Sequence, residues 1–195
     1  MLKMLYNIYN KNMNILSYIF LSFRLKDWIG NLFVFIPLIL AGLIFDCGFF
    51  LKTVEAFFLF SLSAGAVSIL NDVLDIEKDK KHPEKSKRPI ASGKLNSGVA
   101  LFISLILIVL SLWLALQINL RFTILFASFI ILDIIYSLWL EKARFVNSIF
   151  VALTYAIRVY AGGAVINSSL NIWYFIFSFL FGLFHFFYKK KKEHK

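Results

Sequence analysis

Residues 98–117 read GVALFISLILIVLSLWLALQ, a run without a single charged side chain. A transmembrane helix needs about 20 consecutive apolar residues to cross the hydrocarbon core of a bilayer. The run meets that length with no interruption. It therefore predicts a membrane-spanning helix.

Five further apolar stretches approach the same length, and short polar breaks separate most of them. The break after the second stretch is the exception, because it extends over residues 71–97. We expect an all-α, polytopic membrane helix bundle of about six transmembrane helices. The six stretches are residues 28–45, 54–70, 98–117, 122–140, 145–166 and 172–188.

The composition supports the membrane class. Hydrophobic residues make up 60% of the 195 residues and charged residues only 16%, whereas soluble domains carry about 25% charged residues. The formal charge of +10 lies at the ends of the apolar runs, which favours contact with membrane lipids, and we expect no nucleic-acid partner. The single cysteine excludes an internal disulfide.

The positions of the basic residues predict the orientation. Outside the apolar runs, only Lys52 and Arg121 fall on the opposite side if both termini are cytoplasmic. We expect a multi-pass protein of the bacterial cytoplasmic membrane. Residues 1–26 form a cytoplasmic or interfacial segment, in which 15–23 is too short to span. Residues 27–188 form the transmembrane domain with a cytoplasmic active-site loop at 71–97, and residues 189–195 form a basic tail.

The first half of the long loop is acidic. Asn71, Asp75 and Asp79 recur at every fourth position, so a continuing helix places them on one face, and Asp72 lies beside them. Oxygen ligands without histidine or cysteine favour a hard cation such as Mg²⁺. The alternative is a solvated acidic helix end balanced by the lysines that follow.

The second half of the loop is basic. Lys85 and Arg88 lie between Pro83 and Pro89, and Gly93 closes the segment. Prolines stiffen the backbone, and a rigid basic segment facing a metal-binding helix suits a diphosphate. The alternative is ordinary cytoplasmic positive charge in contact with anionic lipid.

The two halves together resemble the UbiA superfamily of intramembrane prenyltransferases. The resemblance rests on Asn-Asp-x-x-Asp-x-x-x-Asp at 71–79 and Arg-Pro-Ile-x-Ser-Gly at 88–93. Further segments are similar to the branch that transfers phosphoribosyl groups to decaprenyl phosphate. These are Arg24-x-Lys26-x-Trp28-x-x-Asn31, His82-Pro83-x-Lys85, Tyr136-Ser137-Leu138 and Arg158-Val-Tyr-Ala-Gly-Gly.

The resemblance implies a helical bundle whose central cavity opens to the cytoplasm and to lipid. It implies Mg²⁺ as the cofactor, a diphosphate-bearing donor and an isoprenoid lipid substrate. The implied metal ligands are Asn71, Asp72, Asp75 and Asp79, and the implied catalytic residues are Asp75, Asp79, Lys85 and Arg88. The implied substrate-binding residues are Lys26, Asn31, Lys85, Arg88, Asp133, Tyr136 and Arg158.

Two residues of this set are charged and lie within apolar stretches, so they are candidates on their own account. Asp133 lies one turn before Tyr136, and Arg158 is more than a turn from either end of its stretch. Ionisable side chains inside a membrane are by default functional candidates. Asp133 either lines the cavity or pairs with Arg158 as a structural contact.

The chain departs from the family pattern in several places. In the second acidic motif, the expected aspartate falls on Asn147 and the expected lysine on Glu141, and a lysine usual before Asn31 is Gly30. Relatives have about nine helices, so we expect a truncated family member lacking the last three. Four consecutive lysines at 189–192 suggest a reading-frame slip in an adenine run.

The leading hypothesis is a UbiA-type transferase that moves a phosphoribosyl group to a polyprenyl phosphate. Transfer of a prenyl chain to an aromatic acceptor is the second possibility. A hypothesis of another class is a catalytically inactive membrane protein, favoured by the departures from the motifs. A cation channel has only the acidic residues in its favour, and the basic loop argues against it.

Overall fold

The computed structural model describes residues 15–139 and 144–193, and every regular element in these ranges is a helix. The predicted all-α class is therefore confirmed. The long helices are α4 (Cys47–Leu74), α6 (Ser97–Ile118), α7 (Leu120–Trp139), α8 (Arg144–Val165) and α9 (Ile172–Glu193).

Four helices in the described ranges are long and apolar enough to cross a membrane, namely α4, α6, α7 and α8. Two shorter apolar segments, Trp28–Leu40 and Ile172–Tyr188, correspond to the first and last predicted spans. Helices thus account for most of each apolar stretch, although residues 41–45 of the first stretch lie outside a helix, and the first and last segments contain fewer residues than a standard span.

The first span differs most from its prediction. Residues 28–45 are not one α-helix but a 3₁₀ segment, η1 (Leu25–Phe35), followed by the short α3 (Ile36–Leu40), which has Pro37 in its first turn. A 3₁₀ helix rises about 2.0 Å per residue against about 1.5 Å in an α-helix. The two segments together therefore extend about 30 Å, which matches the hydrocarbon core of a bilayer.

Capping side chains set where two of the long helices begin. Asp46 Oδ1 accepts a hydrogen bond from Phe49 N at 3.0 Å, so α4 begins at Cys47 and the predicted polar break at 46–53 is mostly helical. Asn96 Oδ1 accepts from the backbone N–H groups of Gly98 and Val99 at 2.9 and 3.2 Å and starts α6. Such caps satisfy N–H groups that have no partner inside the helix.

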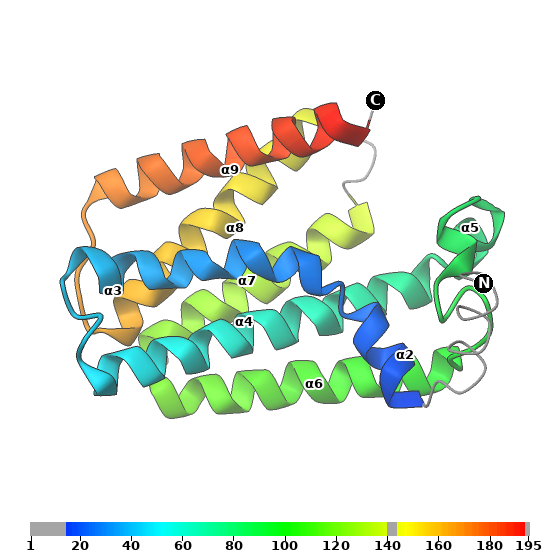
Figure 1. Cartoon of the computed structure of the whole chain (residues 1–195), viewed down its shortest axis with the longest axis horizontal. Helices are drawn as coiled ribbons and strands as arrows, with labels where there is room; N and C mark the ends of the chain where they lie inside the picture. The colour runs from blue at the N-terminus through cyan, green and yellow to red at the C-terminus, as the bar shows by residue number, and fades with distance from the viewer. Residues whose placement is uncertain (1–14, 140–143, 194–195) are drawn as a thin grey trace, which may run out of the picture.

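The helices run side by side in an elongated bundle (Figure 1). The α8–α9 hairpin lies along one side and α4 with α6 along the other, with η1 and α3 running lengthwise between them. Phe60 of α4 packs at the centre against Phe122, Phe126 and Phe129 of α7, with ring centroids 5.0–6.0 Å apart. Large apolar side chains on the outer face of α6, such as Phe102 and Trp113, are more than half exposed, as suits contact with lipid.

One end of the bundle carries the long loop. Here α4 passes into the short α5 (Ile76–Lys81), followed by the 3₁₀ turn η2 (Lys85–Lys87). The N-terminal α2 (Ile15–Ser22), within the predicted interfacial stretch, contacts α4 and crosses it at an angle near this end (Figure 1). The acidic and basic halves of the loop therefore meet at one end of the bundle.

Candidate active site

The acidic motif lies at the junction of α4 and α5. Asp75 separates the two helices, but its N–H donates to Asn71 O at 3.0 Å and the Asp79 N–H donates to Asp75 O at 2.8 Å. These hydrogen bonds keep the helical spacing across the junction. Asn71, Asp75 and Asp79 thus follow one another at single-turn intervals, as the spacing predicted.

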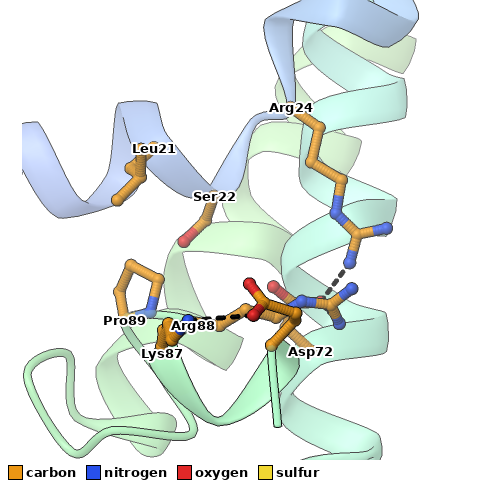
Figure 2. Close-up of a pocket in the computed structure, with 8 residues that line it drawn as sticks. Leu21, Ser22, Arg24, Asp72, Lys87, Arg88 and Pro89 are labelled. Atoms are coloured by element: carbon orange, nitrogen blue, oxygen red, sulfur yellow. Dashed lines mark hydrogen bonds and ion pairs between the residues drawn. The ribbon is translucent and has the colours of Figure 1, made fainter. Parts of the chain in front are cut away.

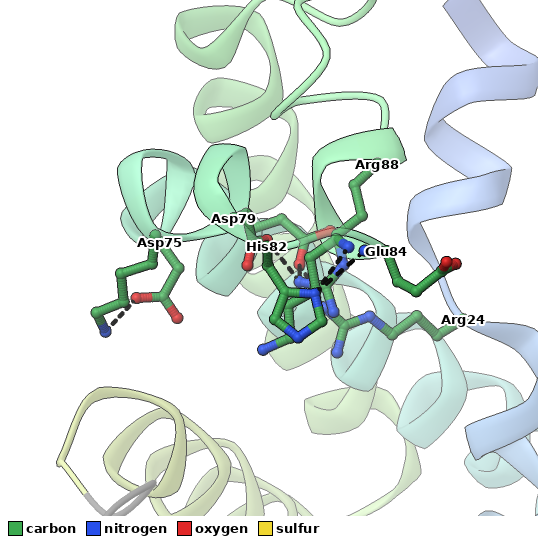
Figure 3. Close-up of polar contacts among 9 residues, drawn as sticks. Arg24, Asp75, Asp79, His82, Glu84 and Arg88 are labelled. Atoms are coloured by element: carbon green, nitrogen blue, oxygen red, sulfur yellow. Dashed lines mark hydrogen bonds and ion pairs between the residues drawn. The ribbon is translucent and has the colours of Figure 1, made fainter.

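Two carboxylates of the motif are buried and bound to arginines. Arg88 Nη1 donates to Asp72 Oδ1 at 2.9 Å and to Asp79 Oδ2 at 2.7 Å, and Arg24 Nη2 donates to the same Asp72 oxygen. Both aspartates are only 2% exposed. Figure 3 shows Arg24 and Arg88 reaching this junction from two separate segments of the chain. Breaking a buried ion pair on one side costs about 3–5 kcal/mol, so the four side chains depend on one another.

The structure does not gather the four predicted metal ligands into one set. Asp72 and Asp79 meet through Arg88, whereas Asp75 Oδ1 accepts from Lys78 Nζ at 2.6 Å. No three acidic, histidine or cysteine side chains of residues 15–139 and 144–193 are placed to hold a metal ion together. The oxygen donors suit Mg²⁺ in kind, and binding would require Arg88 and Lys78 to release them.

The basic half of the loop is held in shape by short-range contacts. His82 Nδ1 accepts from the backbone N–H groups of Glu84 and Lys85 at 3.2 and 3.3 Å, which starts the η2 turn. Lys85 therefore lies at a fixed point of the loop, three residues before Arg88. The His82-Pro83 pair that the resemblance singled out has a structural role here.

A cavity of about 300 Å³ lies beside this cluster, between α2 and the basic loop. Figure 2 shows Arg24, Asp72 and Arg88 at its wall, with Leu21 and Ser22 of α2 opposite Pro89. The remaining lining residues are Glu84 and Lys87, which pair with each other at 3.0 Å. Charged groups from three separate elements thus face one space.

A second polar cluster lies inside the bundle. Arg158 Nε of α8 donates to Asn31 Oδ1 of η1 at 2.8 Å, and Asn31 Nδ2 donates to Ser61 Oγ of α4 at 3.0 Å. The Arg158 guanidinium lies 4.5 Å from the ring centroid of Phe129 and 5.4 Å from that of Tyr155. Two residues predicted to bind substrate, 127 positions apart, therefore contact each other.

The structure describes the other predicted substrate residues, Asp133, Tyr136 and Lys26, to different extents. Asp133 lies on α7, and Tyr136 lies one turn further along the same helix. Lys26 lies on η1, and its side chain is outside what the structure describes.

The departures from the family pattern have structural counterparts. A Cβ at Gly30 would lie 3.2 Å from the Tyr155 hydroxyl, so glycine fits closely at the position where the family resemblance predicted lysine. Asn147 is buried, and its Oδ1 has no hydrogen-bond partner within the part of the chain that the structure describes. Glu141 lies outside the described residues.

Arg24 is the site residue that sequence reasoning did not assign. It contributes to the matched motif before the first helix, but nothing in local spacing links it to Asp72, which is 48 positions away. From the sequence alone, a single arginine before an apolar run is interpreted as ordinary cytoplasmic positive charge.

Comparison with known proteins supports the motif assignment. The sequence model of the UbiA prenyltransferase family matches residues 31–193. The chain belongs to the UbiA prenyltransferase family. Its helices and this membership make it a multi-pass membrane protein.

Several curated proteins and a solved structure are similar to this chain. A decaprenyl-phosphate phosphoribosyltransferase of Mycobacterium tuberculosis is 30% identical over 84% of this chain and 55% of the relative. Nodulation protein NoeC of Azorhizobium caulinodans is 30% identical over 80% of this chain and 50% of the relative. A structure described for digeranylgeranylglyceryl phosphate synthase superposes with a TM-score of 0.71 at 25% identity, covering 89% of this chain and 60% of that one. The chain thus spans about half the length of the curated relatives it matches, or less.

Proposed function

We propose that this UbiA-family chain is a membrane transferase that moves a phosphoribosyl group from a Mg²⁺-bound diphosphate donor to a polyprenyl phosphate. The observation that carries the proposal is the cluster of Asp72, Asp79, Arg24 and Arg88 at one end of the bundle. It combines carboxylates that suit a hard cation with arginines that suit phosphate. The name of the Mycobacterium tuberculosis relative supports this donor and acceptor.

In this proposal the donor diphosphate binds at the loop. Asn71, Asp75 and Asp79, with Asp72 beside them, would hold Mg²⁺, which would supply positive charge to the diphosphate as a leaving group. Arg88 moves from its two carboxylates to the diphosphate, and Lys85 binds it from η2. The bond from ribose to diphosphate breaks, and a bond from ribose to an oxygen of the acceptor phosphate forms.

We assign the buried cluster of Asn31, Ser61 and Arg158 to the binding of substrate groups other than the donor diphosphate. Asn31 and Arg158 offer donors inside the bundle, with Asp133, Tyr136 and Lys26 on neighbouring segments. Arg158 Nη1 is buried without a hydrogen-bond partner within the described residues, so it can donate to an anionic group without breaking an existing hydrogen bond.

The membrane arrangement is part of the proposal. We place both termini, the loop at 71–97 and the tail at 189–195 in the cytoplasm, because the basic residues gather there. Residues 1–26 lie at the interface, residues 27–188 form the transmembrane domain, and the membrane is the bacterial cytoplasmic membrane. The donor then reaches the loop from the cytoplasm.

The test uses membranes containing the full chain, radiolabelled phosphoribosyl diphosphate and polyprenyl phosphate. We expect a labelled lipid whose formation requires Mg²⁺. Asp79→Asn should lower the rate by at least about 100-fold, as expected when a group that stabilises transition-state charge is lost. Glu77→Gln is the matched control, because Glu77 is exposed on the same short helix and pairs only with Lys80 among the described contacts.

Prenyl transfer is the second candidate, favoured by two relatives from Sulfurisphaera tokodaii. A protoheme IX farnesyltransferase is 32% identical over 62% of this chain, and a digeranylgeranylglyceryl phosphate synthase is 31% identical over 58%. Incubation of the same membranes with a prenyl diphosphate and an aromatic acid separates the candidates. A prenylated acid without any phosphoribosylated lipid would reverse the preference.

A catalytically inactive membrane protein is the candidate of another class. Asn147 in place of the expected aspartate favours it, as do the ion pairs that Asp72 and Asp79 make with arginines. This candidate predicts that Asp75→Ala and Asp79→Ala have no effect on growth or on any Mg²⁺-dependent transfer. A loss of transfer in either variant excludes it.

A further inference from the structure

Arg24 has an unfavourable backbone conformation, and the contacts of its side chain offset the energetic cost. Its φ of 47° and ψ of 57° are left-handed, at the turn where α2 ends and η1 begins. This conformation costs non-glycine residues about 1–2 kcal/mol, and glycine would adopt it freely. An arginine in this place is stabilised by what its guanidinium contacts.

The guanidinium contacts a carboxylate that another arginine also uses. Asp72 Oδ1 accepts from both Arg24 and Arg88, and Arg88 Nη1 is in turn divided between Asp72 and Asp79. The Asp72 side chain is 3% exposed and that of Arg24 is 33% exposed. Arg24 therefore supplies Asp72 with a second positive charge from the accessible side.

The charge balance of the cluster decides how firmly Arg88 is held. With Arg24 present, two arginines face two carboxylates, and Arg88 has to neutralise only part of the negative charge. Without Arg24, Arg88 alone faces two buried carboxylates, and the cluster carries a net negative charge. Negative charge in a poorly solvated site repels an approaching anion and retains the remaining cation.

We infer that Arg24 is a positioning residue, which neutralises Asp72 and so releases Arg88 to bind the donor diphosphate. This inference rests on the proposed function, because it assigns a task within the same site. Arg24 acts through Asp72 and Arg88 and takes no part in bond breaking. It therefore sets the affinity for the donor and leaves the rate of the bound complex nearly unchanged.

The experiment measures diphosphate affinity and transfer kinetics in the purified full chain. The binding probe is inorganic diphosphate with Mg²⁺, followed by its protection of the chain against thermal unfolding. We expect Arg24→Gln and Arg24→Gly to weaken this binding about tenfold, because the uncompensated carboxylate charge then repels the diphosphate and holds Arg88. The KM for phosphoribosyl diphosphate should rise by the same factor, with kcat within about threefold.

Three further variants distinguish positioning from a purely structural role. Arg24→Lys keeps the charge and should retain affinity within about threefold. The double variant Arg24→Gln with Asp72→Asn restores the charge balance and should bind diphosphate more tightly than Arg24→Gln alone. Arg121→Gln is the matched arginine control, because Arg121 is exposed at the other end of the bundle, where Nη1 donates to Ser168 O.

Four outcomes would overturn the inference. The first is an Arg24→Gln affinity equal to that of the wild type and of Arg121→Gln. The second is a double variant that binds no better than Arg24→Gln. The third applies if Arg24→Gln does not fold, and it is a tenfold loss of diphosphate affinity in Arg24→Lys. A wild-type chain that binds no diphosphate is the fourth, and it removes the proposed function as well. Diphosphate binding without phosphoribosyl transfer would remove only the proposed reaction, and the binding measurements would still decide the role of Arg24.

Discussion

Gly162 of α8 lies where the helix packs directly on the backbone of the first span. A Cβ added here would be 2.0 Å from the carbonyl oxygen of Val34 and 3.2 Å from Cδ of Pro37. Heavy atoms in ordinary contact lie about 3.5–4.0 Å apart, so Gly162→Ala forces α8 and η1 apart by more than about 1 Å. Neither obstacle is a flexible side chain that could rotate away.

The adjacent Gly163 provides a matched comparison on the same helix. Its added Cβ would meet only the side chain of Leu170, at 2.7 Å, and that side chain can change rotamer. Alanine favours a helix over glycine by about 1 kcal/mol at either position, whereas overpacking costs about 1–3 kcal/mol or more. We expect Gly162→Ala to destabilise the chain by about 2 kcal/mol, and Gly163→Ala to change stability by less than about 1 kcal/mol.

The assay is reversible unfolding of the purified chain in detergent micelles, with both variants measured beside the wild type. The prediction concerns the difference in unfolding free energy between the two variants, because both gain the same helix propensity when glycine becomes alanine. Equal stability of the two variants, or a Gly162→Ala chain more stable than the wild type, would refute the close approach of α8 to Val34. The same variant should also weaken the Asn31–Arg158 contact, since Asn31 lies one 3₁₀ turn before Val34.

Three other predictions concern caps, the buried cluster and the metal. Asn96→Ala removes the acceptor for two N–H groups at the start of α6 and should cost about 1 kcal/mol in thermal unfolding. Asn31→Leu leaves Arg158 Nε and Ser61 without their buried partner and should cost about 3 kcal/mol, against about 1 kcal/mol for Ser61→Ala; equal losses would contradict the network. Chelation of divalent metal should abolish lipid labelling and added Mg²⁺ should restore it, whereas labelling that persists in chelator would exclude a metal-bound donor.

The helices themselves could be predicted from the sequence because the apolar runs are long and the polar breaks between them are short. The start of α4 could not be placed well, since residues 46–53 include Lys52 and Thr53 and read as an outer loop. Their structure depends on the cap at Asp46 and on the burial of Thr53 in the bundle. The polarity of a short segment is a weak guide when a neighbouring helix buries one of its faces.

The sequence predicts candidate site residues but not the contacts among them. The spacing of Asn71, Asp75 and Asp79 could be read as one helix face because that relation is local. The pairing of Arg24 with Asp72 joins segments far apart in the chain, and no periodicity encodes it. Asn31 and Arg158 were each assigned to substrate, yet each is the other's hydrogen-bond partner, a relation that only the packing of η1 against α8 creates.

Because the first span begins as a 3₁₀ helix, its side chains point in different directions around the helix axis than they would in an α-helix. Successive residues turn by about 120° in a 3₁₀ helix and by about 100° in an α-helix. From Leu25 to Asn31, the two forms therefore diverge by about a third of a full rotation. Rewound as an α-helix from the same starting point, η1 would aim Asn31 away from Ser61 and Arg158. The winding of this segment, as well as its sequence, thus selects the side chain that meets the buried arginine.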